Sequence, residues 1–177
     1  MALLHLADAW AKDRGGSATA LIVDHGLRTA SAQEAEATRH ALDKMAIAAV
    51  VLRATGPATG NLQAWARHQR YMLMNDWCRR HGVLHLLVAH HANDLAETVL
   101  AALTRDAGLA GTAGMAAVRE LQDCRLLRPL LDVRRDRLEA TLTRQGIGWI
   151  DDPSNRDRRF RRVRLREKLF GTHEGEA

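Results

Sequence analysis

Residues 86–100 read LLVAHHANDLAETVL and contain the change from strand to helix that decides the fold. The apolar residues at the start are typical of a buried parallel strand, which ends where His90 and His91 follow. The residues after them are apolar at helical spacing, so a helix begins at once. Near its start it carries Asp94 and Glu97, which lie three positions apart on one helical face. The stretch therefore predicts one strand-to-helix connection of an α/β protein.

The same alternation recurs along the chain. Four apolar runs predict strands: 18–26, 47–55, 83–91 and 124–131. Five stretches with helical periodicity predict helices: 1–14, 31–46, 61–80, 93–105 and 132–146. Three polar residues are predicted to cap helices, namely Ser31, Asn61 and Asp132, and Gly82 is predicted to end the helix at 61–80. The alternation predicts a doubly wound, mostly parallel sheet with helices on both faces, in one domain over residues 1–150, followed by a basic segment at 151–177.

Polar residues follow the predicted strands where each of them ends. In doubly wound sheets, ligands bind beyond the carboxyl ends of the strands. Asp24 and His25 follow one strand, and His90 and His91 follow another, just ahead of the acidic helix start. The two adjacent histidines point to opposite faces of a strand, which argues against a shared zinc ion. We therefore expect a ligand site at this edge of the sheet.

Two interpretations of the acidic helix start remain open. In the structural one, Asn93 or Asp94 is the N-cap and Glu97 completes a capping box, since acids suit the positive end of a helix. In the functional one, Asp94 and Glu97 present paired carboxylates to a Mg²⁺ ion or to a cationic substrate. The motif by itself favours the structural interpretation, and its position at the ligand edge favours the functional one.

The composition is that of a folded globular protein, 46% hydrophobic and 27% charged, and its 4% of aromatic residues favours helices packed on a sheet. No apolar run approaches the roughly 20 residues needed to cross a bilayer, so no membrane association is expected. Asp8 interrupts the apolar N-terminal stretch, which excludes a signal peptide. Cys78 and Cys124 form neither a CxxC pair nor a metal-binding spacing, which predicts reduced cysteines in a cytoplasmic protein.

The positive charge is concentrated near the end of the chain. The formal net charge is +5. Residues 156–168, RDRRFRRVRLREK, carry eight basic and two acidic residues, so this segment holds more than the whole net charge. Such a patch is typical of a surface that binds a polyanion, and a solvated helix is the alternative.

Six motifs in this order resemble the catalytic domain of the tRNA(Ile)-lysidine synthetases, which belong to the PP-loop superfamily of N-type ATP pyrophosphatases. The motifs cover nearly the whole chain: VDHGLR, NLQAWARHQRY, LLVAHHANDLAETVL, RDAGLAGTAGM, RPLLDVRRDRLE and DDPSNRDRRFRRVRLRE. The resemblance implies a ligase that uses ATP and Mg²⁺ to adenylate the wobble cytidine of tRNA(Ile). L-lysine then attacks the activated carbon, and lysidine, AMP and pyrophosphate are the products.

The resemblance also implies roles for individual residues. Asp94 and Glu97 would be the catalytic acids that hold lysine or Mg²⁺. The nucleotide would lie beside four residues at the strand ends: Asp24, His25, His90 and His91. The phosphates or the tRNA would be bound by five residues: Arg67, Arg70, Ser154, Asn155 and Arg166. Arg162 would serve the adenylation step. A solvated helix face is the alternative for Arg67 and Arg70.

The sequence departs from the family pattern at several points. Val163 stands where the family usually has Asn, and Asp106 and Ala107 replace a usual Gly-Ser pair. The family's first strand and its Ser-Gly-Gly-x-Asp-Ser loop, which cradles the phosphates of ATP, would precede Met1. We therefore expect a truncated catalytic domain, either because a start codon has been placed at an internal methionine or because the sequence was cut there. Such a chain is expected to bind ATP weakly and to be inactive by itself.

The absent first strand would lie at the centre of the sheet. Its loss would leave unpaired backbone groups on two buried strands, at about 1–3 kcal/mol for each unmet group. We therefore expect either direct pairing between strands 18–24 and 84–90 or a homodimer that covers the gap. Two other functions remain open: a tRNA-thiolating PP-loop enzyme, and a non-catalytic module that binds nucleotide or RNA.

Overall fold

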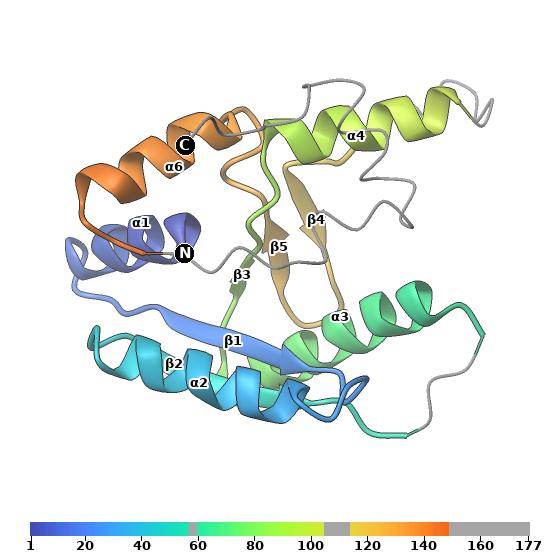
Figure 1. Ribbon diagram of the computed structural model, residues 1–177, viewed down its shortest axis with the longest axis horizontal. Helices are drawn as coiled ribbons and strands as arrows, with labels where there is room; N and C mark the ends of the chain where they lie inside the picture. The colour runs from blue at the N-terminus through green and yellow to red at the C-terminus, as the bar shows by residue number, and fades with distance from the viewer. Residues whose placement is uncertain (57–59, 105–113, 149–177) are drawn as a thin grey trace. The chain divides into compact units, whose positions relative to one another are not determined.

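The computed structural model describes residues 1–56, 60–104 and 114–148, which divide into two compact units (Figure 1). The sheet unit comprises Leu3–Val88 and Val118–Leu127 and contains the five strands of the described residues. The α4–α6 unit holds Met1–Ala2 and the described parts of Ala89–Ala117 and Arg128–Ala177. The basic segment predicted at 151–177 lies outside the described residues.

The first sheet of the sheet unit is a parallel pair joined by a helical crossover. Strand β1 (Thr19–Asp24) pairs in parallel with β2 (Ala48–Arg53), in a register that runs from Thr19 opposite Ala48 to Asp24 opposite Arg53. Helix α2 (Ser31–Asp43) connects them, and helix α1 (Ala2–Lys12) precedes β1. Parallel strands need such a crossover, so the predicted alternation is confirmed here.

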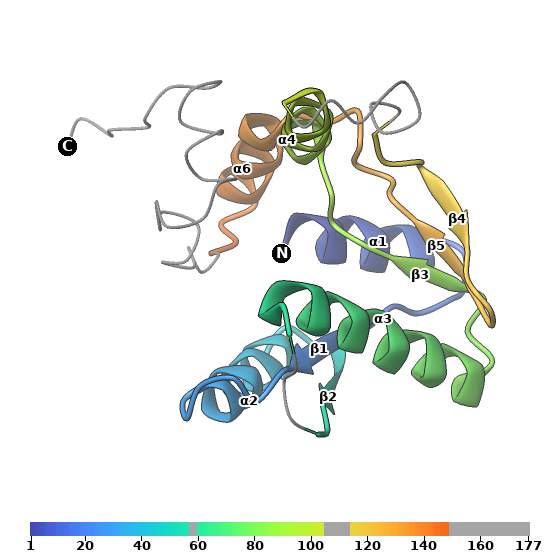
Figure 2. The same ribbon diagram turned by 90° about the vertical axis from the view of Figure 1, so that its right-hand side faces the viewer.

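The second sheet has the order β3-β5-β4 (Figure 2). Strand β3 (His85–Leu87) is parallel to β5 (Arg125–Leu127), and β4 (Val118–Glu120) is antiparallel to β5. The sequence analysis did not predict β4, because its three residues are all exposed and carry no apolar pattern.

The expected direct pairing of β1 with β3 is wrong. Among the described residues, β1 forms a ladder with β2 alone and β3 with β5 alone, so the two sheets remain separate. Because β3 has a neighbouring strand on one side only, its two end residues, His85 and Leu87, are exposed. Leu87 is 37% exposed, whereas the central residue Leu86 is 6% exposed. Parallel strands are normally buried on both faces, so β3 has the exposure of an edge strand.

Helix α3 (Leu62–His81) has the ends that the sequence predicts. Asn61 caps it, since its side-chain oxygen accepts hydrogen bonds from the N–H groups of Gln63 and Ala64 at 3.0 and 3.2 Å. Gly82 ends it in the left-handed conformation, with φ of 63°. A helix of this length needs both ends satisfied because it has four orphan backbone groups at each.

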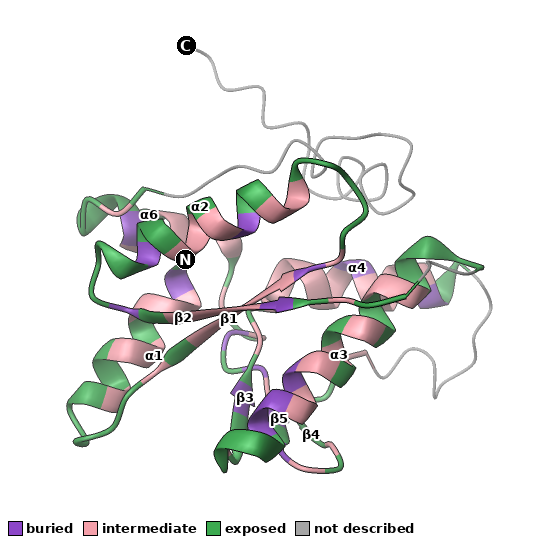
Figure 3. Ribbon diagram, turned by 90° about the horizontal axis from the view of Figure 1, so that it is seen from below, coloured by how far each residue is buried: buried purple, intermediate pink, exposed green. Residues whose placement is uncertain are grey.

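The core of the sheet unit is built where α3 meets both sheets (Figure 3). Met74, Trp77 and Cys78 supply the face of α3. Leu52 comes from the first sheet, and the second sheet and its hairpin supply the remaining residues of the cluster, Leu86, Cys124 and Leu126. This packing therefore joins two sheets that share no backbone ladder within the described residues.

In the α4–α6 unit, two helices are tied at their starts. Helix α4 spans Ala92–Leu103 and α6 spans Arg135–Arg144. The side-chain oxygen of Asn93 accepts a hydrogen bond from the first N–H of α6, that of Arg135, at 3.1 Å. Asp132, which the sequence predicts as the N-cap of this helix, lies two residues ahead of the observed N-cap Arg134. The cap therefore comes from a neighbouring helix, which local sequence patterns cannot reveal.

None of the helices within the described ranges is long and apolar enough to cross a membrane.

Replacing Leu126 by Ala tests the shared core. Leu126 is 0% exposed, so the substitution removes buried methyl groups and leaves a cavity. We expect the free energy of unfolding, measured with urea, to fall by about 2–5 kcal/mol. Met72→Ala is the control, since Met72 lies on α3 but is 55% exposed, and it should change the stability by less than about 0.5 kcal/mol. Equal effects of the two substitutions would contradict the assignment of the core.

Candidate functional site

Asp24 ends β1 and organises the turn that follows it. Its carboxylate Oδ1 accepts a hydrogen bond from the N–H of Gly26 at 2.9 Å, and the residue is 6% exposed. The hydrogen bond from Gly26, and next the one from the Ser31 hydroxyl, hold the pKa of Asp24 below its ordinary value. Ser31 is therefore not the N-cap that the sequence predicts. It is the first residue of α2, behind Ala30, and its hydroxyl serves Asp24.

His25 lies between β1 and the start of α3. Its ring centroid is 6.3 Å from that of Trp65. Burial, followed by the positive charge of Arg70, lowers the pKa of His25, and the negative charge of Asp24 opposes this shift. The structure thus brings together three predicted site residues, Asp24, His25 and Arg70. A neutral His25 can accept a hydrogen bond at one ring nitrogen and donate one at the other.

Arg67 and Arg70 lie three residues apart on the N-terminal part of α3, and both are exposed. The guanidinium carbon of Arg67 is 5.1 Å from the ring centroid of Tyr71, a cation–π contact. Neither arginine forms an ion pair within the described ranges, unlike Arg79 further along the helix, whose Nη2 is 2.6 Å from Asp76 Oδ1. The pair therefore presents uncompensated positive charge to solvent.

The acidic helix start has a different capping arrangement from the one predicted. His91 is the N-cap of α4, and Asp94 occupies the third helical position. The Oδ2 atom of Asp94 accepts a hydrogen bond from the backbone N–H of His91 at 3.0 Å, and His91 Nδ1 lies 3.4 Å from the same oxygen. Asp94, not Glu97, therefore makes the backward contact of a capping box, and neither Asn93 nor Asp94 is the N-cap.

Glu97 is not used in the cap and is buried, at 8% exposure. Acidic side chains are seldom so buried unless they are paired. The pair offers carboxylate oxygens, which Mg²⁺ prefers, but the described part of the chain holds no group of three or more His, Cys, Asp or Glu side chains that could bind a metal ion. The donors therefore fit a Mg²⁺ ion that is also held by substrate phosphates, the usual arrangement in nucleotide enzymes.

The segment at Gly114–Ala117 packs against the start of α4. Gly114 has φ of 73°, and a Cβ built on it would lie 2.7 Å from Leu95 Cδ1. The positive φ and this close approach together favour glycine at position 114, the last glycine of the motif RDAGLAGTAGM. Arg128 holds the same segment from a second side. From the sequence alone Arg128 has no assigned role, because it is recognisable only as a basic residue within the apolar run 124–131.

Four predicted site residues lie outside the described residues, namely Ser154, Asn155, Arg162 and Arg166. The nucleotide-edge prediction for His90 and His91 also stays a prediction. Both histidines lie in the α4–α6 unit, in the segment that leads into α4, and His91 forms a parallel β-bridge with Leu130.

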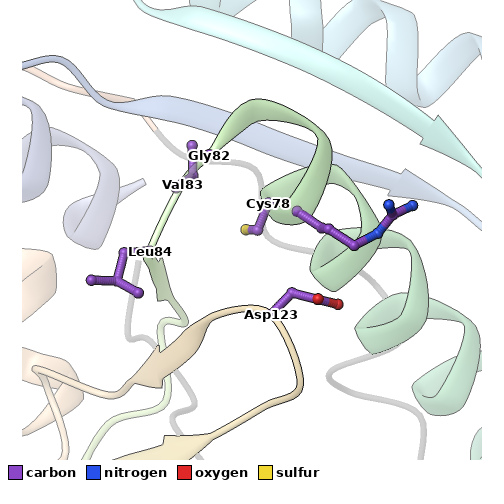
Figure 4. A pocket seen from close by; sticks show the side chains of 6 residues that line it. Cys78, Gly82, Val83, Leu84 and Asp123 are labelled. Atoms are coloured by element: carbon purple, nitrogen blue, oxygen red, sulfur yellow. The ribbon is translucent and has the colours of Figure 1, made fainter.

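A pocket of about 230 Å³ lies elsewhere, at the C-terminal end of α3 and the amino end of β3 (Figure 4). Cys78, Gly82, Val83, Leu84 and Asp123 are among its lining residues. Ligand pockets usually exceed about 300 Å³, so this pocket is small for one. They also lie at the carboxyl ends of parallel strands in α/β proteins, whereas this pocket lies at the amino end of β3. Neither its size nor its position favours a catalytic site. Burial raises the pKa of the Cys78 thiol to about 12, so Cys78 is not a thiolate at neutral pH.

Residues 1–173 match the family described as the PP-loop domain. The chain therefore belongs to the PP-loop family.

Curated relatives extend this result. The tRNA(Ile)-lysidine synthase of Bradyrhizobium diazoefficiens is 44% identical over 173 residues, which are 96% of this chain and 48% of that protein. The tRNA(Ile)-lysidine synthase of Rhodopseudomonas palustris is 44% identical over 173 residues, or 96% and 50% of the two chains. The chain thus spans about half the length of the curated relatives it matches.

Among solved structures, the chain is similar to the U34-tRNA thiolase NcsA from Methanococcus maripaludis, with a TM-score of 0.69. The likeness covers 99% of this chain and 69% of that chain at 14% identity, so it shows the fold alone. It confirms the predicted α/β class.

Asp24 gives a testable pH dependence. Because its pKa is lower in the folded protein than the ordinary 3.8, its stabilisation is present above that pH and is lost as the pH falls through the folded-state pKa. Asp24→Asn should therefore lower the free energy of unfolding at pH 7 by about 1–3 kcal/mol, and the difference from wild type should shrink below pH 3.8. Urea unfolding at several pH values measures this. Asp13→Asn is the control, since Asp13 is exposed, and a difference that does not change with pH would refute the assignment.

Proposed function

We propose that this chain is the PP-loop part of an enzyme that forms lysidine on tRNA(Ile), with ATP and L-lysine as the other substrates. The observation that carries the proposal is the 44% identity with a tRNA(Ile)-lysidine synthase over 96% of the chain. The acidic start of α4 supports it, since the reaction needs groups that hold a lysine ammonium or the Mg²⁺ ion of Mg-ATP.

The two acids act as a pair in this proposal. Asp94 is held by the N–H of His91, which fixes the direction of its carboxylate, and Glu97 is buried one turn later on the same face. A carboxylate in a buried setting attracts an ammonium more strongly than one in water does. We infer that the pair binds the ε-ammonium of lysine and takes up the proton that the amine must lose before it attacks the activated cytidine.

ATP and tRNA have their own supporting residues. Arg67 and Arg70 point to polyanion binding, since neither guanidinium is paired with a carboxylate in the described ranges and an arginine fork matches phosphate oxygens. The histidines and Asp24 remain candidates for the nucleotide edge. Mg²⁺, when bound, would neutralise charge on the phosphates of ATP. In the alternative in which the acid pair holds the metal instead of lysine, Asp94 and Glu97 would be the protein ligands of that ion.

The thiolating alternative is less well supported. Cys78 and Cys124 are the two cysteines of the sequence, and both are buried. Burial raises the pKa of each thiol, whereas sulfur transfer needs an accessible thiolate or a cysteine-bound cluster.

The acids can be tested without disturbing the cap. In a chimaera, this chain replaces the matching 173 residues of the Bradyrhizobium diazoefficiens relative. Asp94→Asn and Glu97→Gln keep the shape of each side chain, and the amide oxygen introduced by Asp94→Asn can still accept the N–H of His91. We expect lysidine formation, followed by mass spectrometry of the tRNA, to fall by about 100-fold or more. The melting temperature should change by no more than a few degrees.

Asp136→Asn is the matched control, because Asp136 also lies in the first turn of a helix but pairs with Arg134 at 2.7 Å. It should leave the rate unchanged. Retained activity in Asp94→Asn and Glu97→Gln would return both acids to a structural role. A wild-type chimaera that makes no lysidine would refute the proposed function.

The arginines predict a salt dependence of tRNA binding. Each phosphate contact contributes about 0.9 to the slope of log Kd against log salt concentration on a duplex, and about 0.7 on a single strand. Joint replacement of Arg158, Arg159 and Arg161 by Gln should reduce the slope measured with the chimaera, and so should Arg67→Gln with Arg70→Gln. Arg79→Gln is the control, because Arg79 is already paired with Asp76. A slope that none of these changes alters would leave the arginines as solvated surface.

A further inference from the structure

Arg128 is a buried cation that lacks a countercharge in the described part of the chain. It directly follows β5, and its residue is 5% exposed. Its Nη1 donates to the carbonyl oxygen of Ala116 at 2.6 Å, and its backbone N–H donates to the carbonyl of Ala117 at 2.8 Å. Its Nε is buried without a hydrogen-bond partner among the described residues.

This arrangement is costly unless another group completes it. A guanidinium carries five N–H donors and a full positive charge at all accessible pH values. One neutral carbonyl satisfies one donor and supplies no opposite charge. Buried charges in folded proteins are normally paired, because an unpaired one loses its hydration without compensation. Arg128 therefore has both the charge and the donors to bind an anion.

The residues around Arg128 also contact the start of α4, the helix that carries Asp94 and Glu97. The carbonyl it binds belongs to the Gly114–Ala117 segment, whose Gly114 packs against Leu95 of α4. Two residues beyond Arg128, Leu130 forms the parallel bridge with His91, the N-cap of the same helix. All these residues belong to the α4–α6 unit. Arg128 is therefore tied by two routes to the first turns of α4, where Asp94 and Glu97 lie.

We propose that Arg128 binds an oxyanion of a substrate in this site. The two small-molecule substrates of the proposed function each carry one: ATP has its phosphates, and L-lysine has its carboxylate. Both match the planar fork of a guanidinium. The inference rests on the proposed function for the identity of these substrates. It makes Arg128 the cationic counterpart of the acid pair, which would hold the positive part of the same or a neighbouring substrate.

A purely structural role makes a different prediction. If Arg128 only holds the carbonyl of Ala116, a lysine can replace it, since one ammonium donor is enough for one carbonyl. If Arg128 binds an oxyanion with its fork, Arg128→Lys keeps the charge and loses the two-point contact. The lysine variant therefore separates the two roles, and Arg128→Gln removes the charge as well.

The binding test uses the chimaera described above with three probes: Mg-pyrophosphate, Mg-ATP and L-lysine. Calorimetry should show that Arg128→Gln raises the Kd for at least one probe by about 30-fold or more, and that Arg128→Lys raises it by about tenfold. Arg119→Gln and Arg119→Lys are the matched controls, since Arg119 lies on β4 and is exposed. A change for pyrophosphate and ATP identifies a phosphate partner, and a change for lysine alone identifies a carboxylate partner.

A second measurement is made on the wild-type residue, and a substitution serves only to assign the signal. Arginine labelled at Nε gives a resonance for the buried N–H of Arg128, identified by its loss in Arg128→Lys. We expect that resonance to shift on addition of the probe that binds, because a hydrogen bond to an oxyanion forms at a buried N–H that has no partner in the described part of the chain. The Arg119 signal should stay in place.

Several outcomes would overturn the inference: unchanged affinities in both Arg128 variants, no shift of the Arg128 resonance, or no binding of any probe to the chimaera with Arg128 intact. These results are distinguishable from a failure of the proposed function. In that failure the chimaera makes no lysidine, while the dependence of anion binding on Arg128 persists. If the function holds and Arg128 does not bind substrate, the chimaera carrying Arg128→Lys keeps its KM values for ATP and lysine.

Discussion

The packing of one face of α3 is the interaction on which the sheet unit depends. Met74, Trp77 and Cys78 contact residues from both sheets, and the two sheets share no ladder within the described residues. Backbone hydrogen bonds therefore hold each sheet together internally, while apolar burial holds one sheet to the other. Because this burial involves the C-terminal half of α3, the N-terminal half is left to present Arg67 and Arg70 to solvent.

The candidate groups are fixed by short contacts to backbone groups at strand ends and helix starts. Asp24 accepts the N–H of Gly26, Asp94 accepts that of His91, and Asn93 accepts that of Arg135. Each contact satisfies a donor that would otherwise be orphaned and restricts the rotamer of the polar side chain at the same time. Such restriction is what a binding group needs, because a flexible carboxylate or amide loses entropy whenever it holds a ligand. The turns that end the strands thus position the chemistry as well as the chain.

Features that depend on residues close together in the sequence can be predicted from it, whereas features that depend on residues far apart in the sequence cannot. Asn61 and Gly82 were predicted to bound α3 because caps act within one turn, and the structure confirms both. Ser31 and Asp132 were assigned wrongly as caps because their actual relations depend on neighbours in space: the hydroxyl of Ser31 serves Asp24, and Asn93 supplies the bond at the start of α6. Arg128 escaped attention for the same reason. A basic residue after an apolar run is common, and only the fold reveals that it is buried beside one carbonyl.

The structural and functional interpretations of Asp94 do not exclude each other. A carboxylate has two oxygens and about four positions at which it accepts hydrogen bonds or metal ions, and the N–H of His91 uses one of them. Carboxylate oxygens also suit the positive end of a helix, and they are the groups that hold an ammonium or Mg²⁺. Glu97 differs in this respect, because it is buried and takes no part in the capping box. The sequence motif makes the two acids look equivalent, whereas the structure gives the capping contact to Asp94.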